Sequence, residues 1–339
     1  MPTLFKRSNG IYYIVTDGKN GRRRWISTGE RTRSRALKCL ATHDEKPEPI
    51  QRSKRLSCFA REFLSSVSSF YSIGTLGIYE NSLRHFLVAV GDQQLSSISA
   101  QHIDIFRQQR LREVSPTTLN LNLRSLRSAF SYAVRWQLLS NNPFTRVPLC
   151  KVPERSPLFF SAEDFKRLVS GIKEKWLKSI VILAACTGMR RGEVVNLKWR
   201  DVDLAQKELR IESSGGYRTK CGKRRAIPLN IVALQLLEEL SKDRLSEYVV
   251  TVEGRRVREP YLSRRFKQYI HRLGFDPSFH FHNLRHSFAS WLVQNGAPIY
   301  EIQKLMGHST IRVTEIYAHL APNQLHGTVE RLSEQLTMN

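Results

Sequence analysis

Four short segments in the C-terminal part of the chain contain side chains that could together transfer a phosphoryl group. The segments are TGMRRGE (187–193), YRTKCGKRRAIPL (217–229), HNLRHSF (282–288) and LMGHSTIRVTEIYAHL (305–320). Guanidinium, ammonium and imidazole groups can donate hydrogen bonds to phosphate oxygens, and an activated tyrosine hydroxyl can act as a nucleophile. The candidate catalytic residues are Arg190, Lys220, His282, Arg285, His308 and Tyr317.

The spacing of Arg190 and Glu193 indicates that a carboxylate supports this arginine. Glu193 follows Arg190 by three residues, one helical turn, just after a buried apolar helix. A carboxylate at this spacing can hold the guanidinium as a rigid fork that suits bidentate capture of a phosphate. Taken alone, such a pair is more often a surface salt bridge.

The segment around His282 suggests an anion site rather than a metal site. His282 and Arg285 share one face of a helix near its start, where the backbone favours anions. His280, His282 and His286 also cluster there, which is a pattern that zinc sites use. Because the segment has neither an H-E-x-x-H motif nor a nearby cysteine pair, we expect no metal.

The lysine and the tyrosine carry weak signals when each is taken alone. Residues 217–229 predict a hairpin with Cys221 and Gly222 near its tip, which would present Lys220 or Lys223. Tyr317 is one of 11 tyrosines, and most tyrosines are core or surface aromatic residues. Only the joint occurrence of the four segments indicates a phosphoryl-transfer site.

The order and the local sequences of these segments resemble the motifs of the tyrosine recombinases, or phage-type integrases. The matching motifs are T-G-x-R at 187–190, H-x-L-R-H at 282–286, L-x-G-H at 305–308 and Y-A-H at 317–319. The match covers four motifs in the family's order, which makes it far more specific than any single motif.

The resemblance implies a role for each candidate. Arg190 and Arg285 would hold the nonbridging oxygens of the scissile phosphate. Tyr317 would be the nucleophile, and Lys220 the general acid for the leaving 5′-hydroxyl.

The remaining three roles follow from the same resemblance. His282 would carry a proton or bind the phosphate, His308 would donate to the phosphate, and Glu193 would support the first arginine. The cations are expected to favour the phenolate of the tyrosine. The resemblance also implies that no metal, other cofactor or ATP takes part.

The elements that must position these residues predict a mainly α fold with small β elements (α+β) in three domains. Residues 1–50 predict a small basic sheet, GIYYIVTD (10–17) and RRRWISTG (22–29), followed by a helix. This part resembles the arm-binding domain of longer integrases, and Arg22, Arg23 and Arg24 are candidate DNA contacts. The alternative is a small sheet whose arginines are merely solvated.

Residues 56–147 predict a compact domain of about four helices, which resembles the core-binding domain of the family. Its longest helix would begin at Ser115-Pro116 and end at Asn141-Asn142-Pro143. Arg124, Arg127 and Arg135 lie on this helix, and the first two are candidate DNA contacts. Proline-containing linkers are expected at 45–55 and 147–160.

Residues 158–339 resemble the catalytic domain, with helices and one β-rich interruption at about 203–230. In the tail, 321–339, Leu325, Val329, Leu332 and Leu336 form a narrow apolar stripe. By resemblance it would dock on a neighbouring protomer, or alternatively fold back on its own domain. The resemblance implies a homotetramer on DNA and a monomer when free.

Charge and composition favour nucleic acid as the partner. The 339 residues contain 54 Lys and Arg against 30 Asp and Glu, a formal net charge of +24. Such a field attracts polyanions. No apolar run is long enough to span a membrane, no secretory signal is evident, and the five scattered cysteines suit reduced thiols in a cytoplasm.

These features predict a site-specific recombinase that acts on double-stranded DNA attachment sites through a 3′-phosphotyrosyl intermediate. It would integrate or excise a mobile element or prophage, with a DNA-bending or directionality factor as a further partner. Two alternatives stay open: a type IB topoisomerase, and a DNA-binding regulator without enzymatic activity. A covalent protein–DNA adduct that requires Tyr317 would separate the last from both enzymes.

Overall fold

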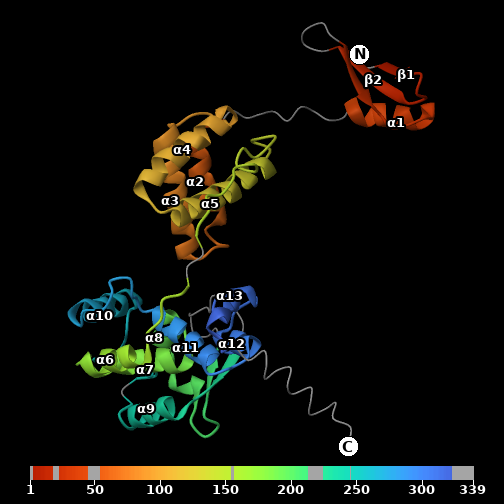
Figure 1. Cartoon of the computed structure of the whole chain (residues 1–339). Helices are drawn as coiled ribbons and strands as arrows, with labels where there is room; N and C mark the ends of the chain where they lie inside the picture. Colours follow the sequence, from red (N-terminus) through yellow and green to blue (C-terminus); the bar gives the residue numbers. More distant parts are fainter. Residues whose placement is uncertain are drawn as a thin grey trace, which may run out of the picture. The chain divides into compact units, whose positions relative to one another are not determined.

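The computed structural model describes residues 3–17, 23–44, 54–153, 156–212, 224–244 and 246–322. It divides the chain into two compact units, residues 1–153 and 154–339. The fold is mainly helical with small β elements, as the sequence predicts, and the strands within the described ranges form three antiparallel sheets (Figure 1). No helix in the described ranges is long and apolar enough to cross a membrane.

The chain begins with a three-stranded antiparallel sheet backed by one helix. The strands are β1 (Thr3–Lys6), β2 (Tyr12–Asp17) and β3 (Arg23–Ser27), and the helix is α1 (Arg33–Asp44). β2 pairs with both other strands. The sequence predicts β2, β3 and α1 but not β1, because four residues are too few to show a periodic pattern.

The following helices form a bundle around a core rich in phenylalanine. They are α2 (Leu56–Val67), α3 (Ile73–Val90), the 3₁₀ turn η1 (Leu95–Ser97), α4 (Ala100–Glu113) and α5 (Pro116–Arg135). The core contains Phe59, Phe63, Phe86, Phe106 and Phe130, which pack largely edge to face. Apolar residues at helical spacing thus produce the four expected helices.

Helix α5 starts where the sequence predicts and ends earlier. Ser115 caps it by accepting a hydrogen bond from the Thr118 amide at 3.3 Å. The helix stops at Arg135, whereas the prediction placed its end at Asn141–Pro143. Gln137 adopts a left-handed φ of 59°, which is incompatible with helix continuation and turns the chain before the Asn-Asn-Pro signal.

The second unit consists of helices and small sheets. They are α6 (Ala162–Gly171), α7 (Lys175–Thr187), α8 (Arg191–Val195), α9 (Ile231–Lys242), α10 (Glu259–Arg272), α11 (Asn283–Gln294), α12 (Ile299–Met306) and α13 (Arg312–Glu315). Short 3₁₀ turns are η2 (Trp199–Asp201) and η3 (Ala318–Leu320). The antiparallel sheet is β4 (Val202–Asp203), β5 (Glu208–Ile211) and β6 (Arg225–Pro228).

This sheet confirms the expected β-rich interruption, but a second hairpin was not predicted. That hairpin pairs β7 (Thr251–Val252) with β8 (Arg255–Arg256). Two-residue strands leave no alternation for a sequence pattern to detect.

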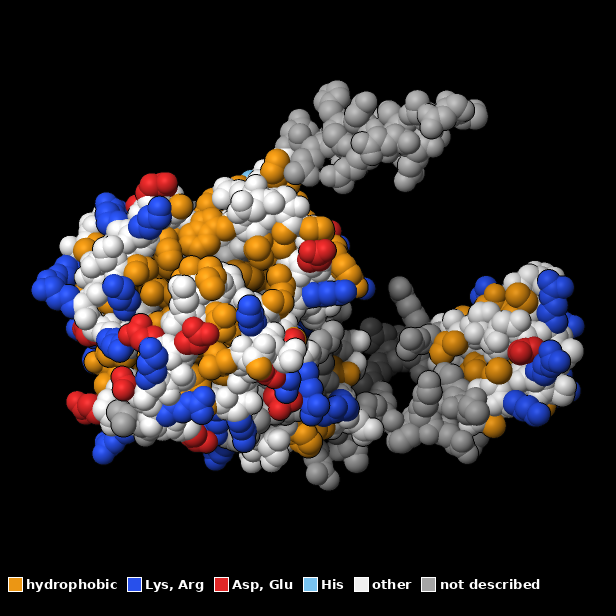
Figure 2. All heavy atoms as spheres, turned by 90° about the horizontal axis from the view of Figure 1, so that it is seen from below, with side chains coloured by type: hydrophobic (Ala, Val, Ile, Leu, Met, Phe, Trp, Pro, Cys, Tyr) orange, Lys and Arg blue, Asp and Glu red, His pale blue; other side chains and the backbone are white. Residues whose placement is uncertain are grey.

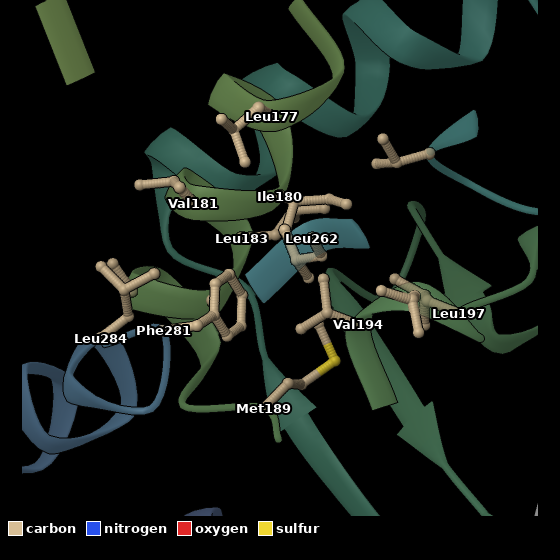
Figure 3. Close-up of a cluster of buried hydrophobic side chains, with 14 of the residues drawn as sticks. Leu177, Ile180, Val181, Leu183, Met189, Val194, Leu197, Leu262, Phe281 and Leu284 are labelled. Carbon is tan, nitrogen blue, oxygen red and sulfur yellow. The ribbon is translucent and has the colours of Figure 1, made fainter. Parts of the chain in front are cut away.

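Helix α7 is the centre of this unit's core. Leu177, Ile180, Val181 and Leu183 lie on α7 and are fully buried, among side chains from α8, α10 and α11 (Figure 3). Helix α7 has more contacts with α11 than with any other element. The two helices that carry the arginine motifs are therefore packed directly on one another.

The predicted linker at 147–160 is shorter in the structure, because both of its ends are fixed. Asn120 accepts a hydrogen bond from the Cys150 amide and donates one to its carbonyl, at 2.8 and 2.9 Å. At the other end Phe160 is fully buried and stacks on Phe279.

Candidate active site

Arg190 is placed by a sharp turn at the end of α7. Gly188 adopts φ 62°, which ends the helix, and Arg190 then immediately precedes α8. A Cβ atom on Gly188 would approach the Phe288 ring to 2.3 Å. The backbone conformation and the close packing both require glycine here, as the T-G-x-R motif has it.

The Glu193 carboxylate is buried between two arginines. Its side chain is 1% exposed, and it accepts hydrogen bonds from the Arg190 amide (2.8 Å) and guanidinium (3.1 Å). Arg225 adds two more hydrogen bonds, at 3.0 and 2.6 Å. Burial alone would raise the pKa of Glu193, but the hydrogen bonds and charges of the two arginines outweigh it and lower the pKa. The pair is therefore not the surface salt bridge that its spacing would suggest alone.

Arg225 also ties this carboxylate to the motif around His308. It begins β6, and its Nε donates to the carbonyl of Leu305 at 2.9 Å. A Cβ atom added to Gly307 would lie only 3.0 Å from the Arg225 side chain. Gly307 ends α12 with φ 63° and accepts a hydrogen bond from Arg190 at 3.2 Å.

Arg285 is almost completely buried and is held by backbone carbonyls. It lies on the first turn of α11 with 2% exposure, and donates to the carbonyls of Gly188 and Met306. These carbonyls belong to the C-terminal ends of α7 and α12, where the helix dipole is negative. Burial, together with the charge of Arg190, lowers the pKa of Arg285 to about 9, so it stays charged at neutral pH.

His308 follows Gly307 and is oriented by Thr314. The His308 Nδ1 lies 2.9 Å from the Thr314 hydroxyl, which is fully buried. Burial, with the nearby charges of the three arginines of the site, lowers the pKa of His308 to about 4. The imidazole is therefore neutral at pH 7.

Tyr317 is buried rather than exposed on the surface. It is 1% exposed and packs with Phe288 and Ala289 of α11. Its hydroxyl lies 2.5 Å from the Nδ1 of His286. Burial raises the pKa of Tyr317 to about 12, against the attraction of Arg285. The charge of Arg285 favours the phenolate, as the sequence reasoning expects, but in this conformation desolvation of the buried phenol outweighs that attraction.

His282 immediately precedes α11, as the sequence predicts for a residue near the helix start. Its ring meets the His286 ring edge to face, with centroids 5.0 Å apart. Desolvation, together with the charges of the neighbouring histidines and arginines, lowers the pKa of His282.

Most of the predicted residues therefore lie in one site. Mutual electrostatic effects connect Arg190, Arg285, His282, His308 and Tyr317. Lys220 and its alternative Lys223 lie outside the described residues, as does the tail beyond residue 322.

The candidate DNA contacts of the first unit have different environments. Arg23 and Arg24 lie on β3, and Arg22 lies outside the described residues. Arg124 is exposed on α5. Arg127 is half-buried and donates to the carbonyls of Phe144 and Val147 at 3.0 and 2.8 Å. The structure gives Arg127 a role in holding the bundle together, which the sequence reasoning did not anticipate.

Three residues of the site were missed. His286 was weighed only as a zinc ligand, and Arg225 and Thr314 were given no role. Arg225 lies among several basic residues of 218–225, where no spacing distinguishes it. Within the described ranges, no group of three or more His, Cys, Asp and Glu is arranged to hold a metal ion.

Comparison with known proteins identifies the family. A model of the phage integrase family matches residues 159–324, which include every candidate catalytic residue. A tyrosine recombinase of Thermosipho africanus is 26% identical over 272 residues, covering 77% of this chain and 94% of that protein. The chain belongs to the tyrosine recombinase family, whose members are enzymes that cut and rejoin DNA.

A XerC-like tyrosine recombinase of Caldanaerobacter subterraneus subsp. tengcongensis is 30% identical over 250 residues. The match covers 62% of this chain, and the chain spans 64% of that relative's length. Taken separately, each of these two matches leaves at least 23% of the chain outside it.

Solved structures extend the likeness of fold to nearly the whole chain. A lambda integrase dimer bound to a COC′ core site has a TM-score of 0.68 at 22% identity, covering 94% of this chain and 95% of that one. The Tn1549 transposon integrase in complex with transposon right-end DNA has a TM-score of 0.69 at 19% identity, covering 81% and 99%. The match to the lambda integrase dimer leaves only 6% of this chain uncovered. That share is smaller than residues 1–50, so the match includes most of them.

Proposed function

We propose that this tyrosine recombinase cuts one DNA strand by attack of Tyr317 on a phosphodiester held by Arg190 and Arg285. The observation that carries the proposal is the convergence of four parts of the second unit on one site. The turn after α7, the start of α11, the end of α12 and the segment after α13 bring the arginines, His308 and Tyr317 together.

The positive charges of the site can stabilise the negative charge of a phosphodiester without a metal ion. In the transition state, negative charge grows on the nonbridging oxygens, where preorganised donors stabilise it. Arg190 and Arg285 are fixed by Glu193 and by helix-terminal carbonyls, so they need little reorganisation. His308, neutral and held by Thr314, adds one more donor through its other ring nitrogen.

In the cleavage step the Tyr317 oxygen forms a bond to phosphorus while the bond from phosphorus to the 5′-oxygen breaks. Lys220 is proposed to give the leaving oxygen its proton. The DNA strand then remains on the enzyme as a 3′-phosphotyrosine. Attack by a 5′-hydroxyl reverses the bond changes, so rejoining requires no ATP.

We further propose that the reaction integrates or excises a mobile element or prophage at double-stranded attachment sites. The sheet of residues 1–50 supports this, because it gives the chain a second basic unit with which to bind DNA away from the cleavage site. On its exposed side the Arg7 guanidinium lies over the rings of Tyr13 and Trp25, at 4.8 and 4.6 Å. Removing this sheet should abolish integration but leave cleavage at the core site intact.

A tetramer on DNA, with each tail (321–339) docked on a neighbour, completes the proposal. Lambda integrase has been solved as a tetramer bound to a Holliday junction. Deletion of residues 321–339 should leave cleavage of a single site but abolish synapsis of two sites. Synapsis that survives the deletion would contradict docking in trans.

The experiment for the proposed chemistry is a search for a covalent adduct. Nicked substrates are made from the DNA that flanks the recombinase's own gene. They trap the intermediate, because the short fragment that carries the freed 5′-hydroxyl diffuses away and cannot rejoin the strand. We expect an adduct that resists detergent with the wild-type protein and none with Tyr317→Phe. Tyr300→Phe, which changes a tyrosine 58% exposed on α12, is the matched control.

The outcomes separate the three candidate functions. An adduct lost only in Tyr317→Phe supports a tyrosine recombinase or topoisomerase, and joining of two separate duplexes selects the recombinase. Relaxation of any supercoiled plasmid without such joining would indicate a topoisomerase. DNA binding without an adduct on the true site, even with a bending factor supplied, would indicate a regulator.

A further inference from the structure

His286 is the side chain that meets the Tyr317 hydroxyl, and the proposed chemistry gives it no role. Its Nδ1 lies 2.5 Å from the tyrosine oxygen. The contact is shielded from bulk water, since Tyr317 is 1% exposed and His286 is half-buried.

The packing of α11 holds the imidazole in this position. The His286 amide donates to the carbonyl of His282 at 3.2 Å, and the two rings meet edge to face. Tyr317 is fixed independently, by packing on Phe288 and by its amide, which donates to the Thr314 carbonyl at 3.1 Å. The main chain of both residues is therefore fixed, and the two side chains pack against the rings of His282 and Phe288.

The charges around His286 keep it neutral. Burial, then the charges of His280 and Arg285, lower its pKa to about 4. His282 packs against its ring, and His308 and Tyr317 face it from the segments after α12 and α13. A neutral imidazole with its proton on Nε2 presents a lone pair on Nδ1, which can accept the phenol proton.

Binding of a phosphodiester would change this balance. Its negative charge between Arg190 and Arg285 would compensate the cations that disfavour an imidazolium. The imidazole would then become a better proton acceptor when the tyrosine must lose its proton. Because the Tyr317 pKa is raised to about 12, attack needs such an acceptor.

We propose that His286 is a catalytic residue that accepts the proton of Tyr317 during strand cleavage. As the bond from the tyrosine oxygen to phosphorus forms, the phenol proton moves to His286 Nδ1, while the leaving 5′-oxygen takes a separate proton from Lys220. In rejoining, the same proton returns to the tyrosine. The inference rests on the proposed role of Tyr317 as nucleophile.

The test compares two leaving groups on the nicked substrate. One substrate carries the normal 5′-oxygen, and the other a bridging 5′-sulfur, which leaves without being protonated. We expect His286→Ala to slow adduct formation about 100-fold or more on both substrates. Lys220→Ala should be slow on the oxygen substrate only, because sulfur removes the need for a general acid.

Two further measurements distinguish proton transfer from packing. His286→Asn places an oxygen near the position of Nδ1 and can accept a hydrogen bond, but it cannot take up a proton. We expect it to bind DNA and unfold in urea like the wild type, yet to remain slow. Added imidazole should restore part of the activity of His286→Ala, and His271→Ala, a change at an exposed histidine of α10, should have no effect.

Wild-type rates in His286→Ala or His286→Asn, or restoration of His286→Ala by the sulfur substrate, would overturn the inference. An adduct that persists in Tyr317→Phe would instead overturn the proposed function. If Tyr317→Phe forms no adduct while His286→Ala is as fast as the wild type, only the inference about His286 fails.

Discussion

The Arg225 guanidinium donates two hydrogen bonds to the Glu193 carboxylate, at 3.0 and 2.6 Å, in a pair that is almost fully buried. The same carboxylate holds Arg190, so a residue of β6 fixes a proposed phosphate ligand through a shared anion.

Loss of the shared carboxylate should harm both stability and cleavage. Glu193→Gln leaves two buried arginines without a counter-charge, and removing one partner of a buried ion pair costs about 3–5 kcal/mol. We expect the urea midpoint to fall and adduct formation to drop at least tenfold. Glu163→Gln, in the first turn of α6, is the control, and equal behaviour of the two variants would contradict the role of Glu193.

Substitution of Gly188 should be much worse than substitution of a glycine with the same backbone conformation in open space. Gly188 and Gly254 have φ of 62° and 73°, but only the former would place a Cβ atom against Phe288. Gly254→Ala should cost roughly 1–2 kcal/mol for the left-handed conformation. Gly188→Ala should cost about 1–3 kcal/mol more, and thermal unfolding of both variants measures the difference.

The histidines of the site should make stability fall in mild acid. For His286 and His308 the pKa is about 4 in the fold and 6.5 in the unfolded chain. Between these values the unfolded chain binds more protons, so the free energy of unfolding rises with pH from 4 to 6.5 and is then constant. We expect a loss on the order of 2 kcal/mol per histidine after screening.

Urea unfolding at several pH values measures this slope. His286→Asn should remove its own share of the pH dependence between 4 and 6.5. An unchanged slope in that variant would show that His286 is not held neutral in the fold.

Arg124 and Arg127 should respond differently to the same substitution. Arg124 is exposed, whereas Arg127 holds two backbone carbonyls near the end of the bundle. Arg127→Gln should lower the unfolding midpoint and leave the salt dependence of DNA binding unchanged. If Arg124 contacts a phosphate, Arg124→Gln should reduce the slope of log K against log salt by about 0.9. The reverse pattern would refute this division.

Thr314 should matter through its hydroxyl rather than its shape. Thr314→Val keeps the branched side chain but removes the partner of His308 Nδ1. We expect adduct formation by Thr314→Val to be roughly tenfold slower or more, because His308 is then no longer oriented to donate to the phosphate. Thr314→Ser keeps the hydroxyl and should remain close to the wild type. Equal rates for both variants would exclude orientation of His308 by this hydroxyl.

The helical elements were predictable because their signals are local. Apolar spacing, with Ser115 before Pro116, located α2 to α5, and the glycine of T-G-x-R located the turn before Arg190. The early end of α5 was not predictable, because the left-handed conformation of Gln137 depends on packing rather than on a turn residue. The short strands β1, β7 and β8 were missed for lack of any period.

The candidate site was predictable as a set of motifs but not as a network. Motif order placed Arg285 and Tyr317 in the chain, yet nothing in the sequence indicated that Arg225 would reach Glu193, 32 positions away. The hydrogen bond of His286 to Tyr317 likewise depends on how the segment after α13 packs on α11. Burial of the tyrosine is a tertiary property, which is why its raised pKa was not anticipated.

The hydrogen bonds that the arginines donate to main-chain carbonyls have a consequence for engineering. Arg285, Arg190 and Arg225 are aimed in part by main-chain oxygens at the ends of α7 and α12, and every residue type carries such an oxygen. These hydrogen bonds do not depend on which side chain the carbonyl-bearing residue carries, except where a glycine is required at the helix end. Exposed positions outside this network could therefore be varied in a library to alter DNA contacts while the proposed phosphate ligands keep their main-chain partners.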